Sequence, residues 1–152
     1  MLVLMRLALG CDHAGYELKE KIKAFLTRTG VEVNDCGTGS SESVDYPDFA
    51  RKVGAEINGG KSERGILFCG TGIGMSIAAN KIPGIRAAMA PTPEAARLSR
   101  LHNDANVLCL AGRFMDSALA EEIVKVWLAT PFEGGRHQRR VDKIRALEQG
   151  SQ

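Results

Sequence analysis

Five short apolar runs alternate with amphipathic helical patterns along this chain, and no other feature of the sequence restricts its fold as strongly. The runs are nearly continuous in apolar character, which is typical of parallel strands covered on both faces. Strands that alternate with helices are joined by right-handed crossovers, so the pattern predicts an α/β fold with a doubly wound sheet. The predicted strands are Leu4–Cys11, Val31–Asp35, Gly65–Cys69, Ile85–Met89 and Asn106–Leu110.

Apolar residues recur at helical spacing between the predicted strands. Gly30 and Pro93 support two of these helices, because glycine is favoured just after a helix and proline in its first turn. The last of these apolar stripes, Val141, Ile144 and Leu147, lies on a basic segment. That segment either packs back on the domain or docks on a second subunit. The stripes are Leu18, Ile22, Phe25 and Leu26; Phe49, Val53 and Ile57; Leu119, Ile123, Val126 and Trp127; and Val141, Ile144 and Leu147.

The composition of the 152 residues is that of one soluble globular domain, with 44% hydrophobic and 25% charged residues. The formal net charge of +2 gives no global field that would indicate a nucleic-acid binder. Arg6 interrupts the apolar start of the chain, so a buried strand is a better interpretation there than a signal peptide. No run approaches the roughly 20 apolar residues of a membrane span. The four cysteines lack metal-binding spacing and indicate a reduced, cytoplasmic protein.

Polar and glycine residues follow the predicted strands at the points where those strands end. In an open parallel sheet, ligands bind beyond the carboxyl ends of the strands. The pattern therefore predicts a single site at one edge of the sheet. The residues at these ends are Cys11–Gly15, Gly37-Thr38, Cys69–Gly72, Ala90–Thr92 and Gly112-Arg113.

A glycine segment, Gly70–Gly74, directly follows the third predicted strand. A dinucleotide fingerprint would need glycine at Met75, and a P-loop would need a Gly-Lys-Ser/Thr that is absent. The segment is interpreted as a nest of backbone N–H groups for a small anion, the alternative being a tight turn without a ligand. Cys69 at its entrance is either an inert buried thiol or, ahead of a helix N-terminus, a reactive thiolate.

Several other polar residues allow two interpretations each. Asp12 either caps a helix or joins His13 in the site, and His102 is interpreted as lying near the same edge. A lone histidine is nevertheless more often structural. Arg136 and Arg140, one turn apart, either clamp a phosphate or form part of a solvated basic face. A thiol, an anion nest, two histidines and several arginines together indicate proton transfer on a small phosphorylated molecule.

Six short segments are far more specific in combination than any one of them alone: Gly10–Gly15, Asp45–Pro47, Cys69–Gly74, Ala78–Lys81, Ser99–Asp104 and Glu133–His137. In this order they resemble the type B ribose-5-phosphate isomerases, the family that also contains the galactose-6-phosphate isomerase subunits. The resemblance implies a Rossmann-like three-layer sandwich with a five-stranded parallel sheet, as a single domain over residues 1–152. It also implies a homodimer or a dimer of dimers, in which the C-terminal helix, residues 136–149, reaches the partner subunit.

The same resemblance implies interconversion of ribose 5-phosphate and ribulose 5-phosphate in the pentose phosphate pathway, without metal, nucleotide or other cofactor. The resemblance implies that Cys69 is the general base and that His102 opens the furanose ring. It implies that the enediolate accepts hydrogen bonds from Thr71 and from the N–H groups of Gly70, Gly72 and Gly74. The implied ligands of the sugar hydroxyls are Asp12, Tyr46 and Asn103, and those of the phosphate are His13, Arg113, Arg136 and Arg140, the last two from the partner.

One branch of the family has a glutamate as base in the glycine segment. Met75 stands at the comparable position and cannot take a proton, so this chain resembles the cysteine branch. Three alternatives remain: an isomerase of allose 6-phosphate or galactose 6-phosphate, a noncatalytic phosphate-sensing module on the same fold, and a polyanion binder that uses the basic tail. The expected partners are a small sugar phosphate and a second copy of the chain, with neither nucleic acid nor membrane.

Overall fold

The computed structural model describes residues 5–150, which contain a sheet of five parallel strands. The predicted five-stranded parallel sheet is therefore confirmed, although the start of the first predicted strand, at Leu4, lies outside the described residues. The strands are β1 (Arg6–Cys11), β2 (Glu32–Asp35), β3 (Arg64–Cys69), β4 (Ala87–Met89) and β5 (Val107–Ala111). Their order across the sheet is β2-β1-β3-β5-β4.

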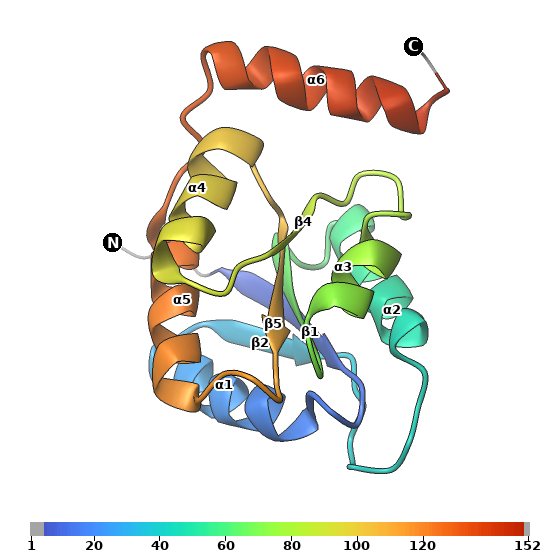
Figure 1. Ribbon diagram of the computed structural model, residues 1–152, viewed down its shortest axis with the longest axis vertical. Coiled ribbons are helices and arrows are strands. Elements are labelled where there is room, and N and C mark those ends of the chain that lie inside the picture. The colour runs from blue at the N-terminus through green and yellow to red at the C-terminus, as the bar shows by residue number, and fades with distance from the viewer. Residues whose placement is uncertain (1–4, 151–152) are drawn as a thin grey trace.

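Helices cover both faces of the sheet and complete the three layers (Figure 1). On one face lie α1 (Tyr16–Arg28), α4 (Pro93–Asn103) and α5 (Ser117–Ala129), and on the other lie α2 (Tyr46–Asn58) and α3 (Ile73–Ala79). The last helix, α6 (Arg136–Glu148), belongs to neither layer.

Strand β3 shows why the strands have nearly continuous apolar sequences. Ile66 and Phe68 lie in the core beneath α1, α4 and α5, whereas Leu67 and Cys69 lie in the core beneath α2 and α3. Successive side chains of a strand point to opposite faces, and here both faces are buried. The positions of β3 from Ile66 to Cys69 are therefore all apolar.

The predicted helix boundaries are confirmed where the sequence carries a signal for them. Gly30 follows α1 with φ of +85°, a left-handed conformation that glycine adopts at low cost. Pro93 is the first residue of α4, and the Thr92 side chain accepts a hydrogen bond from the Ala95 N–H at 3.1 Å.

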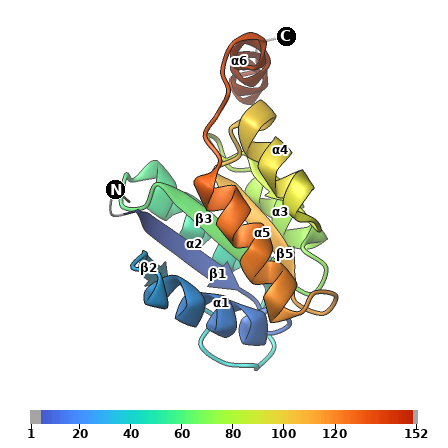
Figure 2. The ribbon, with the colours of Figure 1, turned by 90° about the vertical axis from the view of Figure 1, so that its left-hand side faces the viewer.

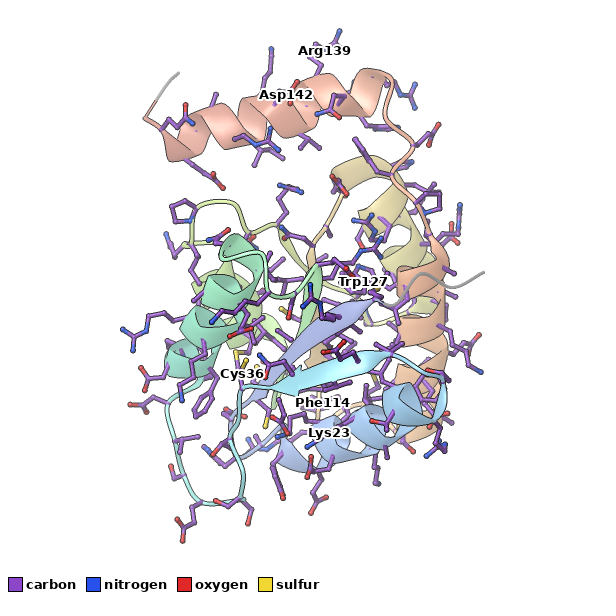
Figure 3. All side chains as sticks on the ribbon, turned by 180° about the vertical axis from the view of Figure 1, so that it is seen from behind. Lys23, Cys36, Phe114, Trp127, Arg139 and Asp142 are labelled. Atoms are coloured by element: carbon purple, nitrogen blue, oxygen red, sulfur yellow. The ribbon has the colours of Figure 1, made fainter. Side chains whose placement is uncertain are left out.

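Helix α6 stands beyond the edge at which the strands begin (Figures 1 and 2). Val141 of its apolar stripe is buried, but Ile144 and Leu147 are exposed. Arg139 projects from the outer side of the helix, away from the sheet (Figure 3). The helix thus buries only part of its apolar stripe against its own chain. Among residues 5–150, no helix combines the length and apolar character needed to cross a membrane.

A buried lysine ties helix α1 to the loop after β2. Lys19, whose side chain is 1% exposed, donates from Nζ to both carboxylate oxygens of Asp35 at 2.9 and 2.8 Å and to Thr38 O at 2.7 Å. Asp35 also accepts from Lys23 Nζ at 3.0 Å and from the Gly37 N–H at 2.9 Å. Burial acts to raise the pKa of Asp35, but hydrogen bonds from these three donors outweigh it and lower the pKa.

Replacing Asp35 by asparagine is expected to destabilise the fold by about 3–5 kcal/mol at pH 7, because the buried charge of Lys19 then loses its hydrogen-bonded carboxylate and keeps only the more distant Glu20 Oε2, at 3.8 Å, as an acidic partner. The native Asp35 pKa is lowered, so the contribution is fully present above the unfolded pKa and is lost as the pH falls below about 4. Urea unfolding between pH 7 and pH 3 measures both effects. Glu94→Gln, which removes an exposed pair with Arg97, is the control. An Asp35→Asn effect as small as the control's would contradict the assignment.

Candidate active site

The carboxyl ends of β1, β3 and β5 meet at one edge of the sheet, as the sequence predicts. Backbone hydrogen bonds fix this edge: the Asp12 N–H donates to Phe68 O at 3.2 Å, and the Gly112 N–H donates to Cys69 O at 2.8 Å. Nine of the predicted site residues lie at this edge, at the end of β3, in the loops after the three strands, and in the first turns of α2 and α3. They are Asp12, His13, Tyr46, Cys69, Gly70, Thr71, Gly72, Gly74 and Arg113.

Cys69, the last residue of β3, is 4% exposed, and its Sγ accepts a hydrogen bond from the Gly72 N–H at 3.2 Å. Gly72 has φ of +77°, and a Cβ there would lie 3.2 Å from Met89 Cγ, so glycine is needed to aim this N–H at the sulfur. A donor in this position stabilises negative charge on the sulfur. Thr71 Oγ1 accepts from the Ile73 N–H at 3.1 Å, which leaves the hydroxyl proton free to be donated.

The remaining three thiols lie in surroundings that disfavour the thiolate. Burial raises the pKa of both Cys11 and Cys36 to about 11. Burial also raises the pKa of Cys109, whose side chain is fully enclosed. Among the four free cysteines, the one with a backbone donor on its sulfur is Cys69.

Two side chains from neighbouring elements pack directly on the glycine loop, residues 70–74. A Cβ on Gly74 would lie 2.7 Å from Tyr46 Cζ, so the Tyr46 ring occupies the space that a side chain would need. A Cβ on Gly70 would lie 3.3 Å from Arg113 Cδ. The loop therefore has a phenol on one side and a guanidinium on another.

Asp12 and His13 follow β1 at the same edge. Asp12 is buried, and its Oδ1 accepts from the Gly15 N–H at 3.0 Å, so it does stabilise the turn before α1 while Oδ2 is left for another donor. Nδ1 of His13 accepts from the Val44 N–H at 3.2 Å. In a neutral imidazole this places the proton on Nε2, which is then the nitrogen that can donate to a ligand.

The other four predicted site residues lie at the opposite edge: His102, Asn103, Arg136 and Arg140. Helix α4 starts beyond the carboxyl end of β4 and returns the chain to the edge where β5 begins, so its last residues are far from the glycine loop (Figure 1). The interpretation that His102 lies near Cys69 is therefore wrong within one chain. A residue just before a parallel strand lies at the amino edge, because the crossover helix has to bring the chain back there.

At this second edge, His102 stacks on His137, with ring centroids 4.4 Å apart and planes at 15°. His137 is buried, and sequence reasoning gave it no role. The signal that could have found it is its place in the Glu133–His137 segment, which belongs to the six segments of the resemblance.

Large apolar side chains lie exposed beside the glycine loop. Ile73, Ile77, Met89 and Phe114 form what we term the apolar face, in which Phe114 is 77% exposed. A cavity of about 260 Å³ opens there, with an almost wholly apolar lining that includes Ile73, Met89 and Phe114. Exposed apolar surface of this kind next to a polar site is typical of a protein interface.

Known proteins resemble this chain both in sequence and in fold. The profile of a family described as Ribose/Galactose Isomerase matches residues 7–144. The chain is 52% identical to ribose-5-phosphate isomerase B of Escherichia coli over 146 residues, which cover 96% of this chain and 98% of that protein. It also resembles the structure of ribose-5-phosphate isomerase B from Clostridium thermocellum (TM-score 0.95, 52% identity, 96% and 99% of the two chains). The ribose 5-phosphate isomerase structure from Thermotoga maritima is similar as well (TM-score 0.91, 55% identity, 92% and 97%). The chain belongs to the ribose/galactose isomerase family.

Proposed function

We propose that this protein interconverts ribose 5-phosphate and ribulose 5-phosphate through an enediolate, with Cys69 as the general base. The observation that carries the proposal is the Cys69 sulfur at the mouth of the glycine loop, with the Gly72 N–H directed onto it at 3.2 Å. Family membership supports it, since the relatives compared above are ribose-5-phosphate isomerases by name.

The chemistry follows from the groups at the carboxyl edge. The thiolate of Cys69 removes the proton from C2 of the open-chain aldose and returns it to C1. The hydroxyl proton of O2 passes to O1 in the same conversion, which leaves the carbonyl at C2. Negative charge develops on the oxygens of the intermediate, and preorganised donors lower the barrier by stabilising it. The hydroxyl of Thr71 and the backbone N–H groups of Gly70, Gly72 and Gly74 fill this role.

The remaining residues of this edge hold the substrate. Asp12 accepts hydrogen bonds from sugar hydroxyls, Tyr46 accepts them or donates them, and His13 and Arg113 bind the phosphate. Interactions with the phosphate, which does not react, supply binding energy that orients the reacting carbons.

A complete site requires a second copy of the chain. His102 would open the furanose ring, Asn103 would bind a hydroxyl and Arg136 with Arg140 would bind phosphate, yet all four lie at the edge opposite Cys69. In a two-fold symmetric dimer each copy gives one edge and receives the other, so two whole sites form. The homodimer, alone or as half of a dimer of dimers, brings residues 136–149 to the partner.

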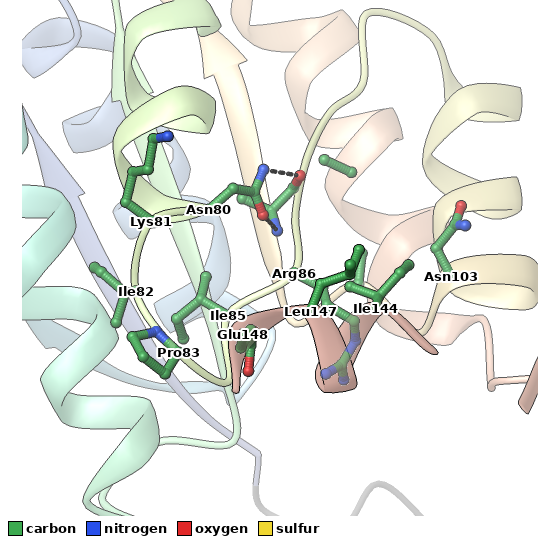
Figure 4. A pocket seen from close by; sticks show the side chains of 13 residues that line it. Asn80, Lys81, Ile82, Pro83, Ile85, Arg86, Asn103, Ile144, Leu147 and Glu148 are labelled. Atoms are coloured by element: carbon green, nitrogen blue, oxygen red, sulfur yellow. Dashed lines mark hydrogen bonds between the residues drawn. The ribbon is translucent and has the colours of Figure 1, made fainter. Parts of the chain in front are cut away.

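Two surfaces support this assembly. The apolar face borders the glycine loop and offers surface for a partner to cover. A cavity of about 560 Å³ lies under α6, lined in part by Ile144, Leu147 and Asn103 (Figure 4). Glu148 ties the far end of α6 to the chain by accepting from the Gly84 N–H at 3.0 and 3.1 Å, so the helix borders this cavity along its inner side.

The proposal extends to the setting of the enzyme. Residues 1–152 act as one domain, the free thiols suit the reducing cytoplasm, and proton transfer by a thiolate needs neither metal nor cofactor. Nucleic acid and membrane have no part in it.

The test is a panel of ribose 5-phosphate, allose 6-phosphate and galactose 6-phosphate, with kcat/KM for each, repeated in D₂O and with a chelator. We expect the highest kcat/KM for ribose 5-phosphate, deuterium at C2 of the aldose and no effect of the chelator. A higher kcat/KM for a six-carbon sugar would replace the substrate assignment. Phosphate-ester binding in calorimetry without any isomerisation would indicate a sensing module instead.

A further inference from the structure

We propose that His137 is a positioning residue that holds the His102 imidazole in the orientation needed to open the sugar ring. This inference rests on the ring-opening role proposed above for His102. The two rings are stacked, with centroids 4.4 Å apart and an interplanar angle of 15°. A flat ring packed on one face of an imidazole prevents that imidazole from rotating toward it, which fixes the direction of its nitrogen atoms.

The backbone around His137 connects it to the segment that carries His102. The Glu133 N–H donates to Leu101 O at 3.1 Å, one residue before His102, and the His137 N–H donates to Gly134 O at 3.1 Å. The short loop ahead of α6 is therefore bound at one end to the last turn of α4 and at the other to the first turn of α6. His137 is 6% exposed, whereas His102 is partly exposed, so the buried ring is the support and the exposed ring faces the ligand.

The charges around the two stacked rings favour the neutral form of the His137 imidazole. Its pKa is lowered by burial and by the neighbouring positive charges of His102, Arg136 and Arg140, while Glu133 acts in the opposite direction. A neutral His137 adds no further positive charge beside His102. Glu133 Oε2 lies 3.8 Å from His137 Nε2.

A shared metal ion is a weaker explanation of the same cluster. His102, Glu133 and His137 have ligand atoms within 4.8 Å of one another, which is close enough to consider a metal. An imidazole nitrogen binds a metal in the plane of its ring, and rings at 15° to each other have no common in-plane point nearby. The two histidines would have to break their stack to hold one ion, so the stack is better explained as support.

The experiment compares three substitutions in the full-length protein: His137→Ala, which removes the stack, His137→Phe, which keeps a flat ring, and Arg139→Ala as a matched control on the exposed side of α6. Two rates are measured for each. The first is kcat for conversion of ribose 5-phosphate, which has to open its ring. The second is deuterium uptake at C1 of ribulose 5-phosphate in D₂O, which needs Cys69 but no ring opening, because the C5 oxygen carries the phosphate and the ketose stays open.

We expect His137→Ala to lower kcat for ribose 5-phosphate by roughly 10- to 100-fold, the scale of a misplaced reacting group, and to change the exchange rate by less than about threefold. His137→Phe should restore most of the lost kcat, and Arg139→Ala should match the unaltered protein in both rates. The inference is overturned if His137→Ala leaves kcat unchanged, if both rates fall together as a folding or assembly defect would make them, or if His137→Phe is as slow as His137→Ala.

A fourth variant separates this inference from the function on which it rests. His102→Gln should lose ribose 5-phosphate conversion and keep exchange, and its loss should be at least as large as that of His137→Ala. Selective loss in His102→Gln without loss in His137→Ala refutes only the positioning role. If His102→Gln shows no selective loss, the ring-opening role itself fails. In the His102→Gln protein the pKa of His137, followed by NMR, should rise, because one of the charges that lowers it is gone.

Discussion

Replacing Cys69 by alanine is expected to lower kcat for ribose 5-phosphate by roughly 10²- to 10⁴-fold, the range that a positioned general base contributes. The glycine loop keeps its N–H groups in this variant, so binding and oxyanion stabilisation remain while proton transfer has no base. Deuterium uptake at C1 of ribulose 5-phosphate should be lost to the same extent, because the exchange also requires removal of a carbon-bound proton. The measurements are kcat, the exchange rate and circular dichroism to verify the fold.

Cys36→Ala is the matched control for this prediction. It removes a partly buried thiol whose pKa burial raises to about 11, so little thiolate is lost and activity should be retained. An unreduced kcat in Cys69→Ala would show that another group is the base. A loss of kcat with exchange intact would instead assign Cys69 to a step that precedes proton transfer at C1, such as ring opening.

The sheet and its helices could be predicted from the sequence because both faces of the strands are buried. Ile66, Leu67, Phe68 and Cys69 are apolar in succession, since each faces one of two cores. The boundary of β4 was less accurate by two residues. Ile85 lies in a turn, where its N–H donates to Ile82 O, and this backbone geometry leaves no mark on the apolar pattern.

Part of the candidate site could likewise be predicted from the sequence, and part of it could not. The residues at the carboxyl ends of β1 and β3 were predictable, because the rule for parallel sheets places strand ends without further knowledge. The position of His102 and the support from His137 were not, because they depend on how α4 and α6 pack across 35 positions of sequence. The ion pair of Lys19 with Asp35 was missed for the same reason, since a buried lysine looks like a surface residue in a sequence.

The central claim is that Cys69 of one copy and His102 of another form each site, and it predicts that two inactive variants complement each other. Cys69→Ala and His102→Gln should each convert ribose 5-phosphate slowly. In a mixed dimer, one site receives the intact Cys69 and the intact His102, and the other site receives both substitutions. The mixed dimer should therefore recover about half of the unaltered activity, as two-fold symmetry requires.

The most direct measurement is to co-express the two variants with different affinity tags, isolate the species that carries both tags, and measure its kcat for ribose 5-phosphate. The account predicts that this species regains about half of the activity of the unaltered protein. The unfractionated mixture should show about one quarter, because about half of its dimers are mixed when the copies assort at random. A doubly tagged species as inactive as its parents, or the failure of any doubly tagged species to form, would contradict it.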